Sequence, residues 1–140
     1  MNKGDLRSSM NGNQIAHWLD KWEESYKKGL LSFWILLQLR IRPTYPFEMK
    51  NLIYDLSIGT ISAEDNSIYR ALRRFEEMGL VVSSLAATGQ GPDRRYYQLT
   101  PDGIELLRAF IRRNILVFQS RPVSEKINQL LSERRITNDE

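Results

Sequence analysis

Two neighbouring stretches decide the fold of this chain, NSIYRALRRFEEMGL at Asn66–Leu80 and RRYYQLTPDG at Arg94–Gly103. In the first, Ile68, Leu72 and Phe75 recur at steps of three and four, which predicts an amphipathic helix that stops at the glycine before its last residue. The second begins with residues typical of a strand and ends with Thr-Pro, an N-cap followed by the first residue of a helix. A helix, a strand and another helix are therefore predicted in close succession.

A β-hairpin is predicted between these two helices. Leu80–Ala86 and Arg94–Leu99 have strand character, and Thr88–Asp93 is a cluster of turn residues that includes two glycines. The helix before the hairpin is expected to start near Ser62 and Asp65, because their spacing resembles a capping box.

Two further helices are expected directly before this unit. Residues 30–39 are apolar nearly all round, which predicts a buried helix. Pro46 suits the first turn of the next helix, which is expected to run to about Leu56. Its inner face is assigned to Phe47, Leu52, Ile53 and Leu56. Three short helices followed by a hairpin describe a winged helix.

Helices are also expected at both ends of the winged helix. An apolar stripe at helical spacing predicts a helix over residues 13–27 that ends or bends at Gly29. The members of this stripe are Ile15, Trp18, Leu19, Trp22 and Tyr26. The helix after Thr100 is expected to run to about Phe118, and Arg121-Pro122 should break it. Ser124 is then expected to cap a last short helix, which ends near residue 134.

The predicted fold class is mainly α with a small β-hairpin (α+β), a winged helix-turn-helix with added N- and C-terminal helices. The expected division begins with a disordered tail at 1–12 and an N-terminal dimerisation helix at 13–28. A winged-helix DNA-binding domain is expected at 29–100. C-terminal dimerisation helices at 101–135 and a tail at 136–140 complete it.

The exposed side of the helix at 66–78 predicts DNA binding. It carries short polar side chains first and arginines one and two turns later, which suits a helix that enters the major groove. These residues are Asn66, Ser67, Arg70, Arg73 and Arg74, and Glu77 lies on the same side. An ordinary solvated helix face remains the alternative interpretation.

Arg94 and Arg95 follow the flexible tip of the hairpin, where basic side chains can reach phosphates or the minor groove. Because neighbours on a strand point to opposite faces, one arginine is expected to face DNA and the other to pack on the domain or pair with an acid. Which of the two faces DNA is left open. The alternative that both arginines only form a charged strand edge that resists aggregation is also left open.

Composition and charge limit the other functions. The formal net charge is +3, and every basic residue between Asn66 and Arg113 is an arginine. The chain has no cysteine and only one histidine, His17, so disulfides, thiolate metal sites and cysteine nucleophiles are excluded. No Gly-x-Ser-x-Gly or phosphate-loop motif occurs, and no metal or cofactor site is expected, so an enzyme is not predicted. No apolar run is long enough to cross a bilayer, and the protein is expected to be soluble and cytoplasmic.

Several stretches resemble the PadR family of transcriptional regulators, over about Gly29–Phe110. They are GLLSFWILL from Gly29, SIYRALRRFEEMGL from Ser67 and GPDRRYYQLTPDG from Gly91. The resemblance implies a dimeric repressor whose third domain helix enters the major groove while the wing touches the backbone. It also implies that Tyr69 lies near the DNA phosphates and that Arg94 or Arg95 is the basic wing residue.

The chain departs from the family in two places. It has Pro46-Phe47 where the family usually has Gly-Tyr, and the connection at residues 58–64 is longer than usual. Its N-terminal helix and short C-terminal end resemble the cyanobacterial circadian period-extender subgroup, which implies regulation of a circadian clock gene.

A homodimer is expected because the helix after Thr100 has two apolar faces and the domain can cover only one. The residues expected at the dimer interface are Ile15, Trp18, Leu19, Trp22, Leu106, Phe110, Ile111 and Val117. Packing of the terminal helices on one another within one chain is the alternative. A small-molecule effector held by Trp18, Trp22 and Trp34 is a less favoured hypothesis, because aromatic residues at helical spacing usually belong to a core or an interface. The rival function is a winged helix that contacts proteins without specific DNA binding.

Overall fold

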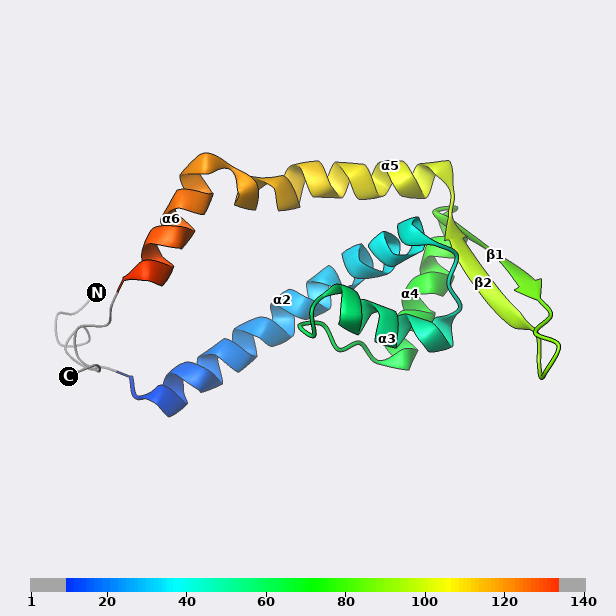
Figure 1. Ribbon diagram of the computed structural model, residues 1–140, viewed down its shortest axis with the longest axis horizontal. Helices are drawn as coiled ribbons and strands as arrows, with labels where there is room; N and C mark the ends of the chain where they lie inside the picture. Colours follow the sequence, from blue (N-terminus) through cyan, green and yellow to red (C-terminus); the bar gives the residue numbers. More distant parts are fainter. Residues whose placement is uncertain (1–9, 134–140) are drawn as a thin grey trace.

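The computed structural model describes residues 10–133, which form six helical elements of α or π type, one 3-10 turn and one two-stranded hairpin (Figure 1). The first part of the chain contains α2 (Gly12–Ile41), α3 (Pro46–Leu56), α4 (Asp65–Glu77), β1 (Val81–Ala86) and β2 (Arg94–Leu99). The second part contains α5 (Pro101–Phe110), the π-helical turn η1 (Ile111–Ile115), the 3-10 turn η2 (Leu116–Gln119) and α6 (Arg121–Ser132). The predicted fold class is confirmed.

The long helix α2 corrects the prediction of two helices with a break at Gly29. Its start is fixed by a capping box, in which the Asn11 side chain accepts from the Gln14 backbone N–H and the Gln14 side chain accepts from the Asn11 N–H, both at 2.9 Å. Gly29 costs a helix only about 1 kcal/mol relative to alanine, and the helix passes through it without interruption. The expected tail at 1–12 lies mostly outside the described residues, and Gly12 already belongs to α2.

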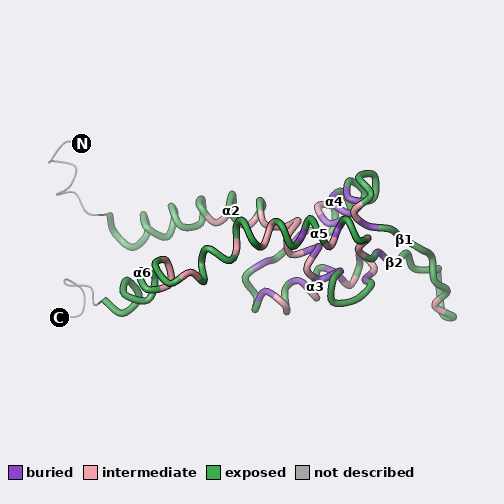
Figure 2. The backbone as a smooth tube through the Cα atoms, turned by 90° about the horizontal axis from the view of Figure 1, so that it is seen from above, coloured by how far each residue is buried: buried purple, intermediate pink, exposed green. Residues whose placement is uncertain are grey.

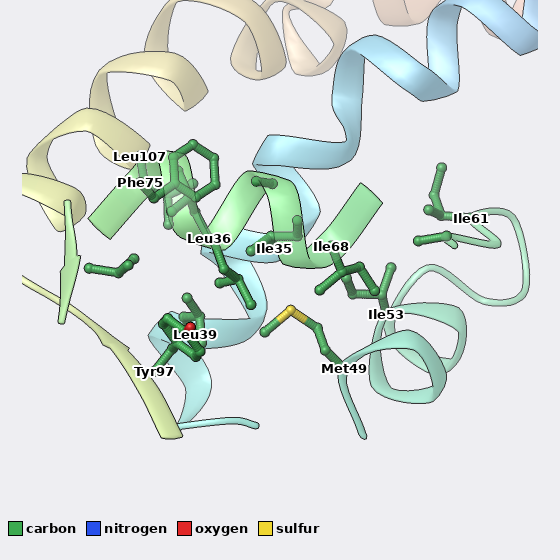
Figure 3. Close-up of a cluster of buried hydrophobic side chains, with 14 residues drawn as sticks. Ile35, Leu36, Leu39, Met49, Ile53, Ile61, Ile68, Phe75, Tyr97 and Leu107 are labelled. Atoms are coloured by element: carbon green, nitrogen blue, oxygen red, sulfur yellow. The ribbon is translucent and has the colours of Figure 1, made fainter. Parts of the chain in front are cut away.

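The core forms where the second half of α2 meets α3, α4 and the hairpin (Figure 3). Side chains from every one of these elements are buried in it. They include Ile35, Leu36 and Leu39 of α2, Met49 and Ile53 of α3, Ile68, Leu72 and Phe75 of α4, and Val81 and Tyr97 of the hairpin. Leu107 of α5 closes the cluster.

The expected inner face of α3 is wrong at Phe47, whose side chain is 74% exposed. The buried stripe is Pro46, Met49 and Ile53, at steps of three and four. Phe47 lies one position further round the helix, and about 100° of rotation turns it away from the core.

The start of α4 also differs from the prediction. Its N-cap is Glu64, and no side chain caps it, so Ser62 and Asp65 do not form a capping box. Asp65 instead lies 3.8 Å from the Lys50 ammonium of α3. The end of α4 is as predicted, because Gly79 adopts the left-handed conformation with φ of 79° and ends the helix.

The hairpin pairs Val81 with Leu99 and Ala86 with Arg94. This register leaves residues 87–93 as the turn. Thr44, in the connection before α3, adds an isolated bridge to Tyr97 through two backbone hydrogen bonds of 3.0 and 2.9 Å. This bridge attaches the wing, defined here as residues 81–99, to the helical domain.

The helices after the wing begin as expected at Thr100, whose hydroxyl accepts from the Gly103 N–H at 3.1 Å. The helical path reaches residue 119, but its last two turns change to π and 3-10 geometry. The final helix starts at Arg121 with Ser120 as N-cap, so Ser124 is not the cap and Pro122 lies in the first turn. Among residues 10–133, no helix is long and apolar enough to span a bilayer.

Buried residues gather around α3, α4 and the elements packed on them, between the exposed hairpin tip and the protruding helices (Figure 2). The first half of α2 and all of α6 are almost entirely exposed, and they extend away from the wing. The structure therefore consists of a packed winged helix with protruding helices at both ends.

Candidate nucleic-acid interface

The exposed face of α4 carries the residues that the sequence assigned to DNA. Ile68, Ala71, Leu72 and Phe75 are buried on the other side of the helix. Asn66, Arg70, Arg73 and Arg74 are exposed, and Ser67 is half-buried. We call these five residues the reading face. Within the described part of the chain, none of its arginines forms an ion pair, so their charges are free to meet phosphate or base edges.

The reading face borders one hollow, and Tyr69, beside it on α4, borders a second. Ser67 and Arg70 line one beside α2, together with Glu23, Lys27 and other residues. Tyr69, 45% exposed, lies on the side of α4 that faces the wing. The face therefore continues toward the wing through Tyr69.

The second hollow, the wing hollow, has a volume of about 600 Å³ and joins three parts of the chain. Its walls come from the start of α3, the start of α4 and the wing. They are formed by Tyr45, Pro46, Phe47, Tyr69, Pro92, Asp93, Arg94, Arg95 and Tyr97. The hollow brings Tyr69 together with both wing arginines, although they lie far apart in the sequence.

The two wing arginines have different partners. The guanidinium carbon of Arg94 lies 4.4 Å from the centre of the Tyr45 ring. Arg95 donates from Nη1 to the Ser83 hydroxyl at 3.0 Å, and that hydroxyl donates to Glu76 Oε2 at 2.7 Å. The alternation of β2 produces this difference, because it directs neighbouring side chains to opposite faces.

Tyr97 lies beneath this cluster and is buried. Burial raises the pKa of its phenol above the usual 10.0, the charge of Glu76 raises it further, and Arg95 and Arg73 act in the opposite direction. The hydroxyl therefore stays protonated at neutral pH, among residues from α4 and the wing.

Sequence reasoning missed several residues of this site, among them Tyr45, Phe47, Glu76 and Ser83. Phe47 could have been found from the helical pattern. Pro46 and Ile53 lie on the inner face of α3, so the residue directly after Pro46 is turned away from that face. The partners of the two arginines depend on the hairpin register and could not be found from the sequence.

The residues expected at a dimer interface fall into two groups. Six are exposed apolar side chains, which the protomer leaves uncovered. They are Ile15, Trp18, Leu19 and Trp22 of α2, Leu106 of α5 and Val117 of η2. Phe110 and Ile111 are half-buried, and Phe110 stacks on Phe33 of α2 with ring centres 5.8 Å apart.

The three tryptophans expected around an effector are spread along α2. Trp22 lines a shallow hollow of about 250 Å³ with Leu19 and Tyr26, while Trp34 lies further along the helix against Phe33. His17 is exposed and packs edge-on against Trp18. Over residues 10–133, no cluster of three or more histidine or acidic side chains offers a metal site.

Comparison with known proteins points to one family. Residues 35–109 match the transcriptional regulator PadR-like family. No protein of curated function matches the chain. Among solved structures, a PadR family transcriptional regulator from Eggerthella lenta aligns with a TM-score of 0.61 and 24% identity, over 88% of this chain and all of its own.

Two other solved structures extend the comparison. A PadR-like transcriptional regulator from Bacillus cereus has a TM-score of 0.57 and 28% identity, over 76% of this chain and 96% of its own. Bacillus subtilis PadR in complex with operator DNA has a TM-score of 0.53 and 19% identity, over 73% of this chain and 68% of its own. The winged-helix architecture is thus shared with known regulators.

Proposed function

The chain belongs to the PadR-like family of transcriptional regulators, and from this premise we propose that it binds operator DNA as a homodimer and represses transcription. The family consists of regulators and not of enzymes, which confirms the prediction that the chain is not an enzyme. One observation carries the proposal: Tyr69, on the same helix as the reading face, and both wing arginines line one hollow. A regulator must share a compartment with the DNA that it binds. We propose that this compartment is the cytoplasm.

In this proposal the reading face lies in the major groove. Asn66 and Ser67 allow close approach, and Arg70, Arg73 and Arg74 supply forked donors to guanine or phosphate. Tyr69 and one of the wing arginines meet the backbone on one side of the groove. The Bacillus subtilis structure supports this arrangement, because that protein has the same fold and is bound to operator DNA.

The protruding helices are proposed to form the dimer. Residues 13–28 and 101–135 would supply the interface, and residues 29–100 would bind DNA. The supporting observation is the exposure of large apolar side chains, 58% for Trp18 and 74% for Trp22, on the half of α2 that extends beyond the packed domain. A twofold dimer would hold two copies of α4 about 34 Å apart, one turn of DNA.

Repression follows if such a dimer covers a promoter, and the resemblance to the circadian period-extender subgroup suggests a clock gene as the target. Footprinting of bound sites across the genome would test both points. Sites outside promoters, or promoters unrelated to the clock, would contradict them.

The DNA proposal is tested by titrating fluorescent duplexes with purified dimer at several salt concentrations. Arg70→Ala and Arg74→Ala should each weaken binding to the best site by about 1–3 kcal/mol, the usual loss for a forked base contact. Arg40→Ala is the control, because Arg40 is exposed in the last turn of α2 and belongs neither to the reading face nor to the wing hollow. If all three variants bind as tightly as wild type, the DNA surface lies elsewhere. If wild type binds no duplex at all, the rival protein-contact function is favoured.

Sedimentation tests the dimer. Trp22→Ser should shift the equilibrium toward monomer, because about 150–250 Å² of aromatic surface can be buried per tryptophan. Phe47→Ser is a matched control, since Phe47 is also 74% exposed but lies in the wing hollow. A monomeric wild type at micromolar concentration would refute the dimer.

A further inference from the structure

The side chain of Arg94 is held in place while its hydrogen-bond donors stay free. Its guanidinium carbon lies over the Tyr45 ring, 4.4 Å from the centre. A cation over an aromatic face is attracted through that face, and the planar guanidinium keeps its N–H donors at its edge. Among the side chains of residues 10–133, no hydrogen bond or ion pair engages Arg94. The donors can therefore meet an incoming anion.

Tyr45 is itself fixed to the strand from which Arg94 projects. Its ring packs edge-on against Tyr96, with centres 5.4 Å apart and planes at 72°. The preceding residue, Thr44, is bridged to Tyr97 by the two backbone hydrogen bonds, and the following residue is the proline that starts α3. Because both ends of this segment are anchored, the ring is a rigid support for the arginine.

Arg95, although also exposed, is engaged by other side chains of the protein. Its Nη1 donates to Ser83, and Ser83 donates to Glu76 near the end of α4. The carboxylate of Glu76 therefore partly balances the charge of Arg95 across one hydroxyl. This chain of hydrogen bonds connects β2 to β1 and β1 to α4, so it sets the angle of the wing against the reading face.

We propose that Arg94 is the wing arginine that binds a DNA phosphate, that Tyr45 is its positioning residue, and that Arg95 is a strut between the wing and α4. This assignment rests on the proposed DNA-binding function. Stacking on Tyr45 removes much of the side-chain freedom that Arg94 would otherwise lose on binding. The contact is to phosphate, so it carries no base information.

The test is a salt titration with a duplex of random sequence, using the full chain. Arg94→Ala should lower the slope of log affinity against log salt by about one unit for each protomer bound to DNA, about two for a dimer, and Arg95→Ala should leave that slope unchanged. A lowered slope in Arg95→Ala and not in Arg94→Ala would overturn the assignment. Unchanged slopes in both, with wild type still binding, would refute a wing contact and leave the DNA-binding proposal intact. A wild type that binds no duplex would refute both.

Tyr45 is tested by a double-mutant cycle. Tyr45→Leu should weaken binding several-fold in the wild-type background, and Tyr45→Phe should restore it, because the ring is kept. In the Arg94→Ala background Tyr45→Leu should have no further effect on affinity. An equal loss in both backgrounds would show that Tyr45 acts only on the fold, and thermal melting of each variant would report such damage directly.

Discussion

Replacement of Gly103 by alanine should destabilise the protein through one backbone contact. A Cβ at this position would lie 2.1 Å from the carbonyl oxygen of Leu80 and 3.1 Å from Leu99 Cδ2. The two backbone segments would have to separate by roughly 1 Å or more to reach ordinary van der Waals contact. They are not free to do so, because the Leu80 carbonyl accepts from the Thr100 N–H at 3.1 Å.

The expected magnitude combines three effects. Forced separation in a packed region costs about 1–3 kcal/mol. Displacement of Gly103 weakens the N-cap hydrogen bond to Thr100, which is worth about 1 kcal/mol. The better helix propensity of alanine returns about 1 kcal/mol. The net loss is about 2 kcal/mol, which lowers Tm by about 6–12 °C in a chain of this size.

Thermal unfolding followed by circular dichroism measures this loss. Gly91→Ala is the matched control, because no atom lies within 4 Å of its Cβ position. A surface change of that kind should stay within about 0.5 kcal/mol of wild type. If Gly103→Ala has the same Tm as wild type, or if both variants lose the same stability, the close approach of α5 to Leu80 does not exclude a side chain at position 103.

Two other changes test further features of the fold. Gly29→Ala should stabilise the protein by about 0.5–1 kcal/mol, because α2 is continuous there and its Cβ position is open; a lower Tm would contradict the continuous helix. Because burial raises the pKa of Tyr97, the folded state holds the phenol proton more tightly, and the resulting stability is present below pH 10 and is lost as the pH rises above it. Tyr97→Phe should therefore reduce the fall of Tm above pH 10, and an unchanged alkaline profile would show that Tyr97 does not titrate in this way.

Local periodicity determined most of the elements from the sequence alone. The apolar stripe of Ile68, Leu72 and Phe75 located α4 and its exposed face, and Gly79 its end. The strand over Arg94–Leu99 and the helix start at Thr100-Pro101 agree with the structure. These features depend on residues within a few positions of one another, so a single sequence contains enough information to place them.

Only the tertiary structure decided which surfaces are covered and which side chains meet. Gly29 lowers helix propensity locally, yet the helix continues, because packing of its second half on α3, α5 and β2 outweighs that small cost. Phe47 faces outward because α3 meets the core through Met49 and Ile53. The different partners of Arg94 and Arg95 follow from strand register and from the bridge at Thr44. All of these depend on contacts between segments distant in the sequence, whose energies local spacing does not encode.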